Sequence, residues 1–170
     1  MGFYGIRYLI MNNISLKQIF LNLILFLCIY YLSFTFISAS LDKIMDPHKF
    51  SEDIAAYGIT PNWMNNIVAI ILPWIELFCG IFLFLSLFKK FRNFKLLDPS
   101  NNLIIGMLIW FIFILSIATI QGLDIDCGCG LGEKVTPFER LVEDIVLLII
   151  SFIIKFRGKI KFLLNIKVQA

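Results

Sequence analysis

The sequence predicts an all-α integral membrane protein: a bundle of four transmembrane helices, with a short amphipathic helix in the first outer loop. Of its 170 residues, 59% are hydrophobic and 16% are charged, whereas a soluble domain averages about 25% charged residues. The apolar residues form long uninterrupted runs, so lipid is the expected solvent. We expect one membrane domain, residues 1–170, with no separate soluble catalytic module.

Three of the four expected spans are clear apolar runs. Residues 19–39 carry no charge and are long enough to cross about 30 Å of hydrocarbon at about 1.5 Å per residue. Residues 67–88 are interrupted only by Pro73 and Glu76, and residues 103–120 are just long enough. These runs predict three helices that cross the bilayer.

The fourth expected span, residues 141–156, is weaker. Glu143 and Asp144 lie near its start and Lys155 near its end, so its fully apolar part is too short to span alone. We expect its ends to lie in the membrane interface or to face the other helices.

A cleaved signal peptide is the alternative for the first run, because Ser38-Ala39-Ser40 resembles a cleavage site. The apolar stretch far exceeds the apolar region of a signal peptide, and the segment before it is long. A membrane span is therefore favoured.

The distribution of Lys and Arg predicts the orientation. These residues are frequent in the N-terminal segment, in residues 89–95 and in residues 155–167, and fewer, among many acids, in residues 40–66 and 121–136. Because cytoplasmic loops carry the Lys/Arg excess, both termini and the middle loop are predicted to be cytoplasmic. In a multi-pass protein of the bacterial inner membrane, the other two loops then face the oxidising periplasm. No basic patch with interleaved aromatics points to nucleic acid.

The first outer loop is predicted to form a short amphipathic helix on the rim of the bundle. Asp46 can cap a helix whose first position is Pro47, and Gly58 can end it. The apolar side chains of this segment, Phe50, Ile54 and Tyr57, fall on one face of the helix. Its acids, Glu52 and Asp53, are expected to face water.

Two cap-then-proline patterns mark further helix starts. Thr60-Pro61 is predicted to begin the second span. Thr136-Pro137-Phe138-Glu139 is a capping box with proline at the first helical position, so the fourth helix is predicted to begin at the outer surface.

The segment before that capping box contains Cys127-Gly128-Cys129, flanked by further glycines. A disulfide between two cysteines this close is strained, and strained, exposed disulfides exchange readily. The following helix N-terminus favours a thiolate, while Asp124 and Asp126 oppose it. Three interpretations stay open: a redox pair, a structural disulfide that holds the third and fourth helices together, and a metal site. Metal is the weakest of them, because His48 lies in the other outer loop and two thiolates are too few ligands for zinc.

Cys28 and Cys79 fall inside predicted spans at similar depths, roughly 17–18 Å from the outer ends at about 1.5 Å per residue. Antiparallel neighbouring helices could bring them together as a second pair. The alternative is that each packs as a small apolar residue.

Glu76 is an ionisable residue inside a span, which is costly unless it faces the bundle interior. It is expected to be protonated, or paired with Lys43 or another polar group near the outer rim. A proton relay beside a redox centre, a hydrogen bond to a quinone head and a structural hydrogen bond between helices are its three open roles.

Three stretches together resemble the DoxX-like membrane family, and most closely its methylamine-utilisation MauE branch. They are Leu41 to Phe50 after the first span, Leu72 to Gly80 in the second, and Cys127-Gly128-Cys129. The resemblance covers about residues 20–155. The family's cysteine motif usually continues with Phe-Gly, whereas Gly130-Leu131 follows here.

The resemblance implies a four-helix membrane fold similar to the bundle of vitamin K epoxide reductase, which passes electrons between quinone and thiols. It also implies a role in the maturation of a disulfide-rich periplasmic dehydrogenase subunit, beside a thioredoxin-like partner. DoxX relatives include a subunit linked to thiosulfate:quinone oxidation.

The sequence therefore predicts a thiol–disulfide redox membrane protein that supports maturation or oxidative folding of periplasmic proteins, with quinone as a candidate acceptor. Cys127 and Cys129 are the expected exchanging pair and Glu76 the expected buried polar group. The rival interpretation is a non-enzymatic membrane scaffold that docks a periplasmic partner, with a structural Cys127–Cys129 bond.

Overall fold

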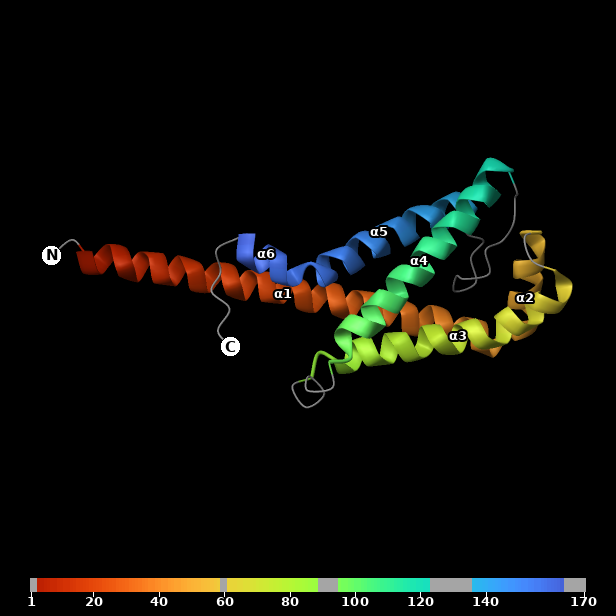
Figure 1. Ribbon diagram of the computed structural model, residues 1–170, viewed down its shortest axis with the longest axis horizontal. Coiled ribbons are helices and arrows are strands. Elements are labelled where there is room, and N and C mark those ends of the chain that lie inside the picture. The colour runs from red at the N-terminus through yellow and green to blue at the C-terminus, as the bar shows by residue number, and fades with distance from the viewer. Residues whose placement is uncertain (1–2, 59–60, 89–94, 123–135, 164–170) are drawn as a thin grey trace.

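The computed structural model describes residues 3–58, 61–88, 95–122 and 136–163, and all secondary structure within them is helical. Figure 1 shows the arrangement. The helices are α1 (Phe3–Met45), α2 (Pro47–Ala56), α3 (Asn62–Leu85), α4 (Leu97–Ile120), α5 (Pro137–Lys155) and α6 (Arg157–Leu163).

Three of these helices are long and apolar enough to cross a membrane, over Leu16–Met45, Trp63–Leu85 and Leu97–Ile120. They contain the first three expected spans, apart from the last residues of the second, and each extends beyond the expected start. The protein is thus a multi-pass membrane protein, and its apolar helices suit a lipid bilayer.

The fourth expected span lies in α5 except for its last residue, and α5 carries too many charged residues to count with the three apolar helices. The first two turns of this 19-residue helix carry Glu139, Arg140, Glu143 and Asp144. The four-span count therefore stays a prediction.

The helices pair in two groups. α1 packs along α3, and α4 packs along α5, while α2 lies against α3. In Figure 1, α3 and α4 lie close together where α3 ends and α4 begins, and they diverge toward the end that carries α2. The N-terminal part of α1 projects beyond the other helices at the opposite end. We call the end with α2 the α2 end.

One face of α1 forms the seam with the other helices. Leu25, Ile29, Leu32, Phe36 and Lys43 are all buried, and their spacing of three, four or seven residues places them on one side of a helix. α1 runs without interruption through Ser38-Ala39-Ser40, the possible cleavage site.

The α1–α3 contact depends on Gly80. A Cβ atom there would lie 2.9 Å from Ile37 Cγ1, 3.2 Å from the Ile37 backbone nitrogen and 3.2 Å from the Ser33 carbonyl oxygen. Small residues permit such close approach of helix backbones in membranes.

Polar contacts join α4 to α5 and its continuation. The Asn101 side-chain amide donates a hydrogen bond to the Ser151 carbonyl oxygen at 3.0 Å, and both residues are buried. At the far end from α2, the Arg157 guanidinium binds the two carboxylate oxygens of Asp98 at 2.7 and 3.1 Å.

The predicted helix boundaries of α2 and α5 agree with the structure. Asp46 accepts a hydrogen bond from the Lys49 backbone N–H, Pro47 opens α2, and Gly58 follows its end with a φ of 64°. The complete capping box of Thr136 and Glu139 starts α5. At the second span the prediction was one residue off: Pro61 is the N-cap of α3 and Thr60 lies outside the described residues.

The expected burial pattern of α2 is only partly present. Phe50 is buried and Ile54 and Tyr57 are half-buried. Glu52 is exposed as expected, but Asp53 is half-buried and lines a cavity instead of facing water. The position of α2 at the membrane surface stays a prediction.

Candidate functional site

A buried ion pair joins α1 to α3 near the α2 end. The Lys43 ammonium donates hydrogen bonds to both carboxylate oxygens of Glu76, at 2.8 Å each. The side chains are 6% and 2% exposed. Of the alternatives expected for Glu76, the structure therefore shows pairing with Lys43.

Two aromatic rings enclose the same ammonium. Lys43 Nζ lies 5.1 Å from the ring centroid of Phe50 on α2 and 5.4 Å from that of Phe111 on α4. Both distances are within the range of cation–π attraction. Lys43 thus connects α1, α2, α3 and α4 at one point.

A cavity of about 500 Å³ adjoins the pair. Side chains of α1 to α5 line it, and most are aliphatic or aromatic. Cavities of this size, largely apolar with a few polar groups, are typical of sites for small organic ligands. Glu76 and Lys43 supply polar groups to its wall.

The cavity reaches the outer surface of the bundle between α3 and α4. Ile67 and Ile71 on α3 and Trp110 on α4 line it, and their side chains are 47%, 52% and 53% exposed. All three lie within helices apolar enough to cross a membrane. A ligand dissolved in the bilayer could therefore enter from the side.

Two residues of the first turns of α5 complete the charged part of the wall. Asp144 is 7% exposed, and the charges of Arg140 and Lys43 attract its carboxylate while those of Glu143 and Glu76 repel it. Arg140 Nη1 pairs with the Glu143 carboxylate. Positive and negative groups thus lie together on the wall of a largely apolar cavity.

Asp144, Arg140 and Phe111 are residues of the site that the sequence did not point to. Asp144 was expected only as a polar residue near the start of the weak fourth span. The useful signal was its spacing from Leu147, Ser151 and Ile154, since all four are buried and share one face of α5.

The structure describes two of the four cysteines. Cys127 and Cys129 lie outside the described residues. Cys28 and Cys79 are free: Cys79 is buried in the apolar core, and Cys28 packs against that core. The structure therefore contains no disulfide between these two, and each packs as a small apolar residue.

Along the chain, Cys127 is five residues after Gly122 and Cys129 seven residues before Thr136. These two described residues adjoin the end of α4 and the start of α5, which lie at the α2 end of the bundle (Figure 1). Cavity-lining residues of α2 and the first turns of α5 belong to the same end.

Comparison with known proteins gives one family. The model of a family described as methylamine utilisation protein MauE matches residues 21–157. No curated protein and no solved structure matches significantly. The match covers α2 to α5 completely, most of α1, and the segment with Cys127 and Cys129.

Proposed function

Because this chain belongs to the MauE family, which suggests a membrane protein associated with methylamine utilisation, we propose that it is a thiol–disulfide exchange protein. It would support the maturation of disulfide-containing proteins in the bacterial periplasm. In the proposed orientation four helices cross the inner membrane, both termini are cytoplasmic, and the α2 end faces the periplasm.

The observation that carries the proposal is the tethering of two cysteines to the bundle end that holds the buried charges. Cys127 and Cys129 lie on a short connection between Gly122 and Thr136. The ion pair of Lys43 and Glu76 and the adjoining cavity lie at that same end. The proposal therefore assigns a redox segment and a site for its acceptor to the same end of the bundle.

In the proposed exchange, a disulfide bond is transferred between a partner protein and the pair of Cys127 and Cys129. The thiolate of one cysteine attacks a sulfur of a partner disulfide, a mixed disulfide forms, and the partner's other sulfur leaves as a thiolate. The second cysteine then attacks the mixed disulfide, so the Cys127–Cys129 bond forms and the partner is released as a dithiol. Run in reverse, the oxidised pair oxidises a partner.

Reoxidation of the pair needs an acceptor of two electrons and two protons. A quinone is the acceptor we propose, because it is lipid-soluble and the cavity opens toward lipid. Two S–H bonds break, one S–S bond forms, and the quinone becomes the quinol. Glu76 is proposed as a buried group beside this site, held in place by Lys43.

Trapping of single-cysteine variants tests the proposal. Cys127→Ser or Cys129→Ser removes the resolving thiol, so the remaining cysteine should accumulate a covalent adduct with a periplasmic partner. We expect the partner to be thioredoxin-like. Non-reducing gels after acid quenching of whole membranes detect the adduct, and the double Cys→Ser variant is the control that should show none.

The opposite result favours the scaffold. A structural disulfide predicts a permanently oxidised wild-type pair, no adduct from either single variant, and only lower stability of those variants. That result would contradict thiol exchange and leave a membrane scaffold that docks a periplasmic partner.

A further inference from the structure

Asp144 lies in the cavity wall and is 7% exposed. Its carboxyl group makes no hydrogen bond or ion pair with any part of the chain that the structure describes. Burial of a carboxyl group without a hydrogen bond is costly. A ligand that supplies a donor at this position would remove that cost.

The neighbouring cations are already engaged. Lys43 donates to both oxygens of Glu76, and Arg140 pairs with Glu143. Their charges nevertheless act on Asp144 from a distance, and so do those of the two glutamates. Asp144 and the two glutamates are three acids against two cations, which disfavours an anionic head. A cationic head would have to leave water for a largely apolar cavity, which is costly. The cavity therefore favours a neutral head that carries a hydrogen-bond donor.

The rest of the cavity suits an apolar body. Ile67, Ile71, Ile75 and Trp110 line the side that opens between α3 and α4, and each is at least two-fifths exposed. Phe111 and Leu108 line it further inside, where Leu108 is buried. A molecule with an extended apolar part can leave that part in contact with lipid while its head reaches Asp144.

We propose that this cavity binds a neutral amphiphile from the bilayer, whose hydroxyl-bearing head donates a hydrogen bond to Asp144 and whose apolar body lies between α3 and α4. The inference concerns the same cavity to which the proposed function assigns a quinone, but it does not depend on thiol exchange, because binding requires neither Cys127 nor Cys129. Reduced quinones, with hydroxyls on an aromatic ring, and diacylglycerols, with a hydroxyl on a glycerol unit, are membrane molecules that carry such a head.

Titration of the full chain in lipid nanodiscs tests the proposal. Trp110 is the reporter after Trp63→Phe and Trp74→Phe, which change side chains that are 67% and 48% exposed and do not line the cavity. The probes are a decyl-substituted hydroquinone, its dimethyl ether and dioctanoylglycerol. The ether has the same ring and tail but lacks the donor, so comparison of the two isolates the hydrogen bond.

We expect at least one hydroxyl probe to bind saturably. If it is the hydroquinone, its Kd should be at least about tenfold lower than that of the ether, because a site that must satisfy a buried polar group rejects the analogue that lacks the partner. If it is dioctanoylglycerol alone, the diacylglycerol class is identified, and its binding must weaken at least about tenfold in Asp144→Leu.

Variants of Asp144 decide whether this residue provides the acceptor. Asp144→Leu should reduce the preference for hydroquinone over ether to within about twofold. Asp144→Asn keeps one acceptor oxygen and should weaken hydroxyl-probe binding at least about threefold, which provides the test if the leucine variant does not fold. Asp98→Asn removes a carboxylate at the other end of α4 and should leave binding unchanged.

Three results would overturn the proposal: no saturable binding of either hydroxyl probe, equal affinity for hydroquinone and ether without dioctanoylglycerol binding, or hydroxyl-probe binding unaffected by both Asp144 variants. The same titration with Cys127→Ser and Cys129→Ser together separates this site from thiol exchange. Binding should persist in that variant whether or not the exchange proposal holds.

Discussion

Lys43 and Glu76 each take the place of the water that would otherwise surround the other's charge, because both side chains are buried. Their two 2.8 Å contacts satisfy both carboxylate oxygens, and the rings of Phe50 and Phe111 cover the ammonium. Removal of one partner from a buried ion pair leaves an uncompensated charge, whereas removal of both does not. The pair should therefore behave as a unit.

The effects of Glu76 and Lys43 substitutions on the free energy of unfolding should be non-additive in a double-mutant cycle. Glu76→Leu should destabilise the protein by about 3–5 kcal/mol, because Lys43 stays buried without its counter-charge. The double variant Glu76→Leu with Lys43→Met should be more stable than Glu76→Leu alone. Chemical denaturation in detergent micelles measures the differences.

Two further variants serve as controls for the stability measurements. Glu76→Gln keeps one acceptor for Lys43 and should cost less than Glu76→Leu. Lys49→Met changes an exposed lysine on α2 and should shift the free energy of unfolding by no more than about 0.5 kcal/mol. Strictly additive costs in the double variant would show that the pair is not coupled.

The residues of the site were predictable to different degrees. Glu76 was identified because a charged residue inside an apolar run is conspicuous, and Lys43 was one of its expected partners. Asp144 was missed because its burial arises from packing of α5 against the bundle, which no local pattern of charge reveals. The roles of Cys127, Cys129 and Glu76 in catalysis stay predictions.

At Gly80, α3 passes close to the backbone of α1. Gly80 has backbone atoms of Ile37 and Ser33 at distances that a Cβ atom could meet only by moving α1. Backbone cannot rotate away as a flexible side chain can. Packing of α1 on α3 therefore depends on the absence of one methyl group.

Gly80→Ala should destabilise the protein by about 1–3 kcal/mol, the usual cost of overpacking a close contact. Gly106→Ala on α4 is the matched control, because nothing lies within 4 Å of its Cβ position. Since alanine favours helix over glycine, the control should be neutral or slightly stabilising. Thermal unfolding in the same detergent compares the two variants, and equal Tm values would contradict the importance of this contact.

Helix centres were predicted better than helix ends. The apolar runs located α1, α3 and α4, but each helix begins before its run because polar residues such as Asn62 and Asp98 also adopt helical backbone. Where a side chain caps the helix, the capping signal predicted the helix start correctly, as at Asp46 and Thr136. At Pro61 no side-chain cap exists, and the prediction was one residue off.

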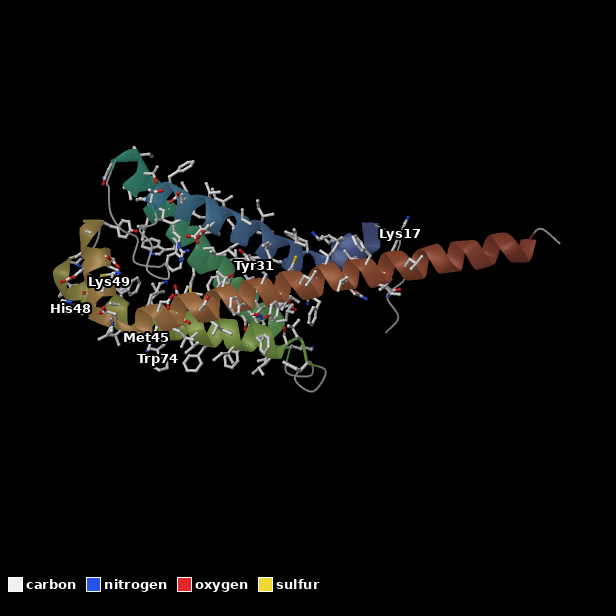
Figure 2. All side chains as sticks on the ribbon, turned by 180° about the vertical axis from the view of Figure 1, so that it is seen from behind. Lys17, Tyr31, Met45, His48, Lys49 and Trp74 are labelled. Carbon is white, nitrogen blue, oxygen red and sulfur yellow. The ribbon has the colours of Figure 1, made fainter. Side chains whose placement is uncertain are left out.

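On the scale of the whole molecule, Lys17 lies on the projecting part of α1 and His48 and Lys49 lie on α2 at the other end (Figure 2). If α1 spans the bilayer, these positions are on opposite sides of the membrane. The Lys/Arg distribution predicts that Lys17 is cytoplasmic and His48 periplasmic.

Labelling with a membrane-impermeant thiol reagent tests this orientation. In a variant whose Cys127 and Cys129 are serine, His48→Cys should be labelled in intact cells with a permeable outer membrane. Lys95→Cys, in the connection between α3 and α4, should be labelled only after the inner membrane is disrupted. Labelling of position 95 in intact cells would overturn the orientation.

The same assay counts the spans. If α5 crosses the membrane, Lys159→Cys should be protected in intact cells, like position 95. If α5 remains on the periplasmic side, position 159 should be labelled with position 48. The charges in the first two turns of α5 make this the least predictable helix, because they fit both an interface and a bundle interior.

Synthesis of the chain delivers Lys43 to the membrane before Glu76. Lys43 lies near the end of α1, where a lysine can extend its ammonium to the membrane surface, but Glu76 lies well inside α3. During insertion, the Lys43 ammonium can therefore stay at the membrane surface until its partner is synthesised. The Glu76 carboxylate has no such position, because it would be surrounded by lipid. We expect α1 to be retained beside the insertion site until α3 arrives, so that the two helices enter the bilayer as a neutral hairpin before α4 and α5 are added.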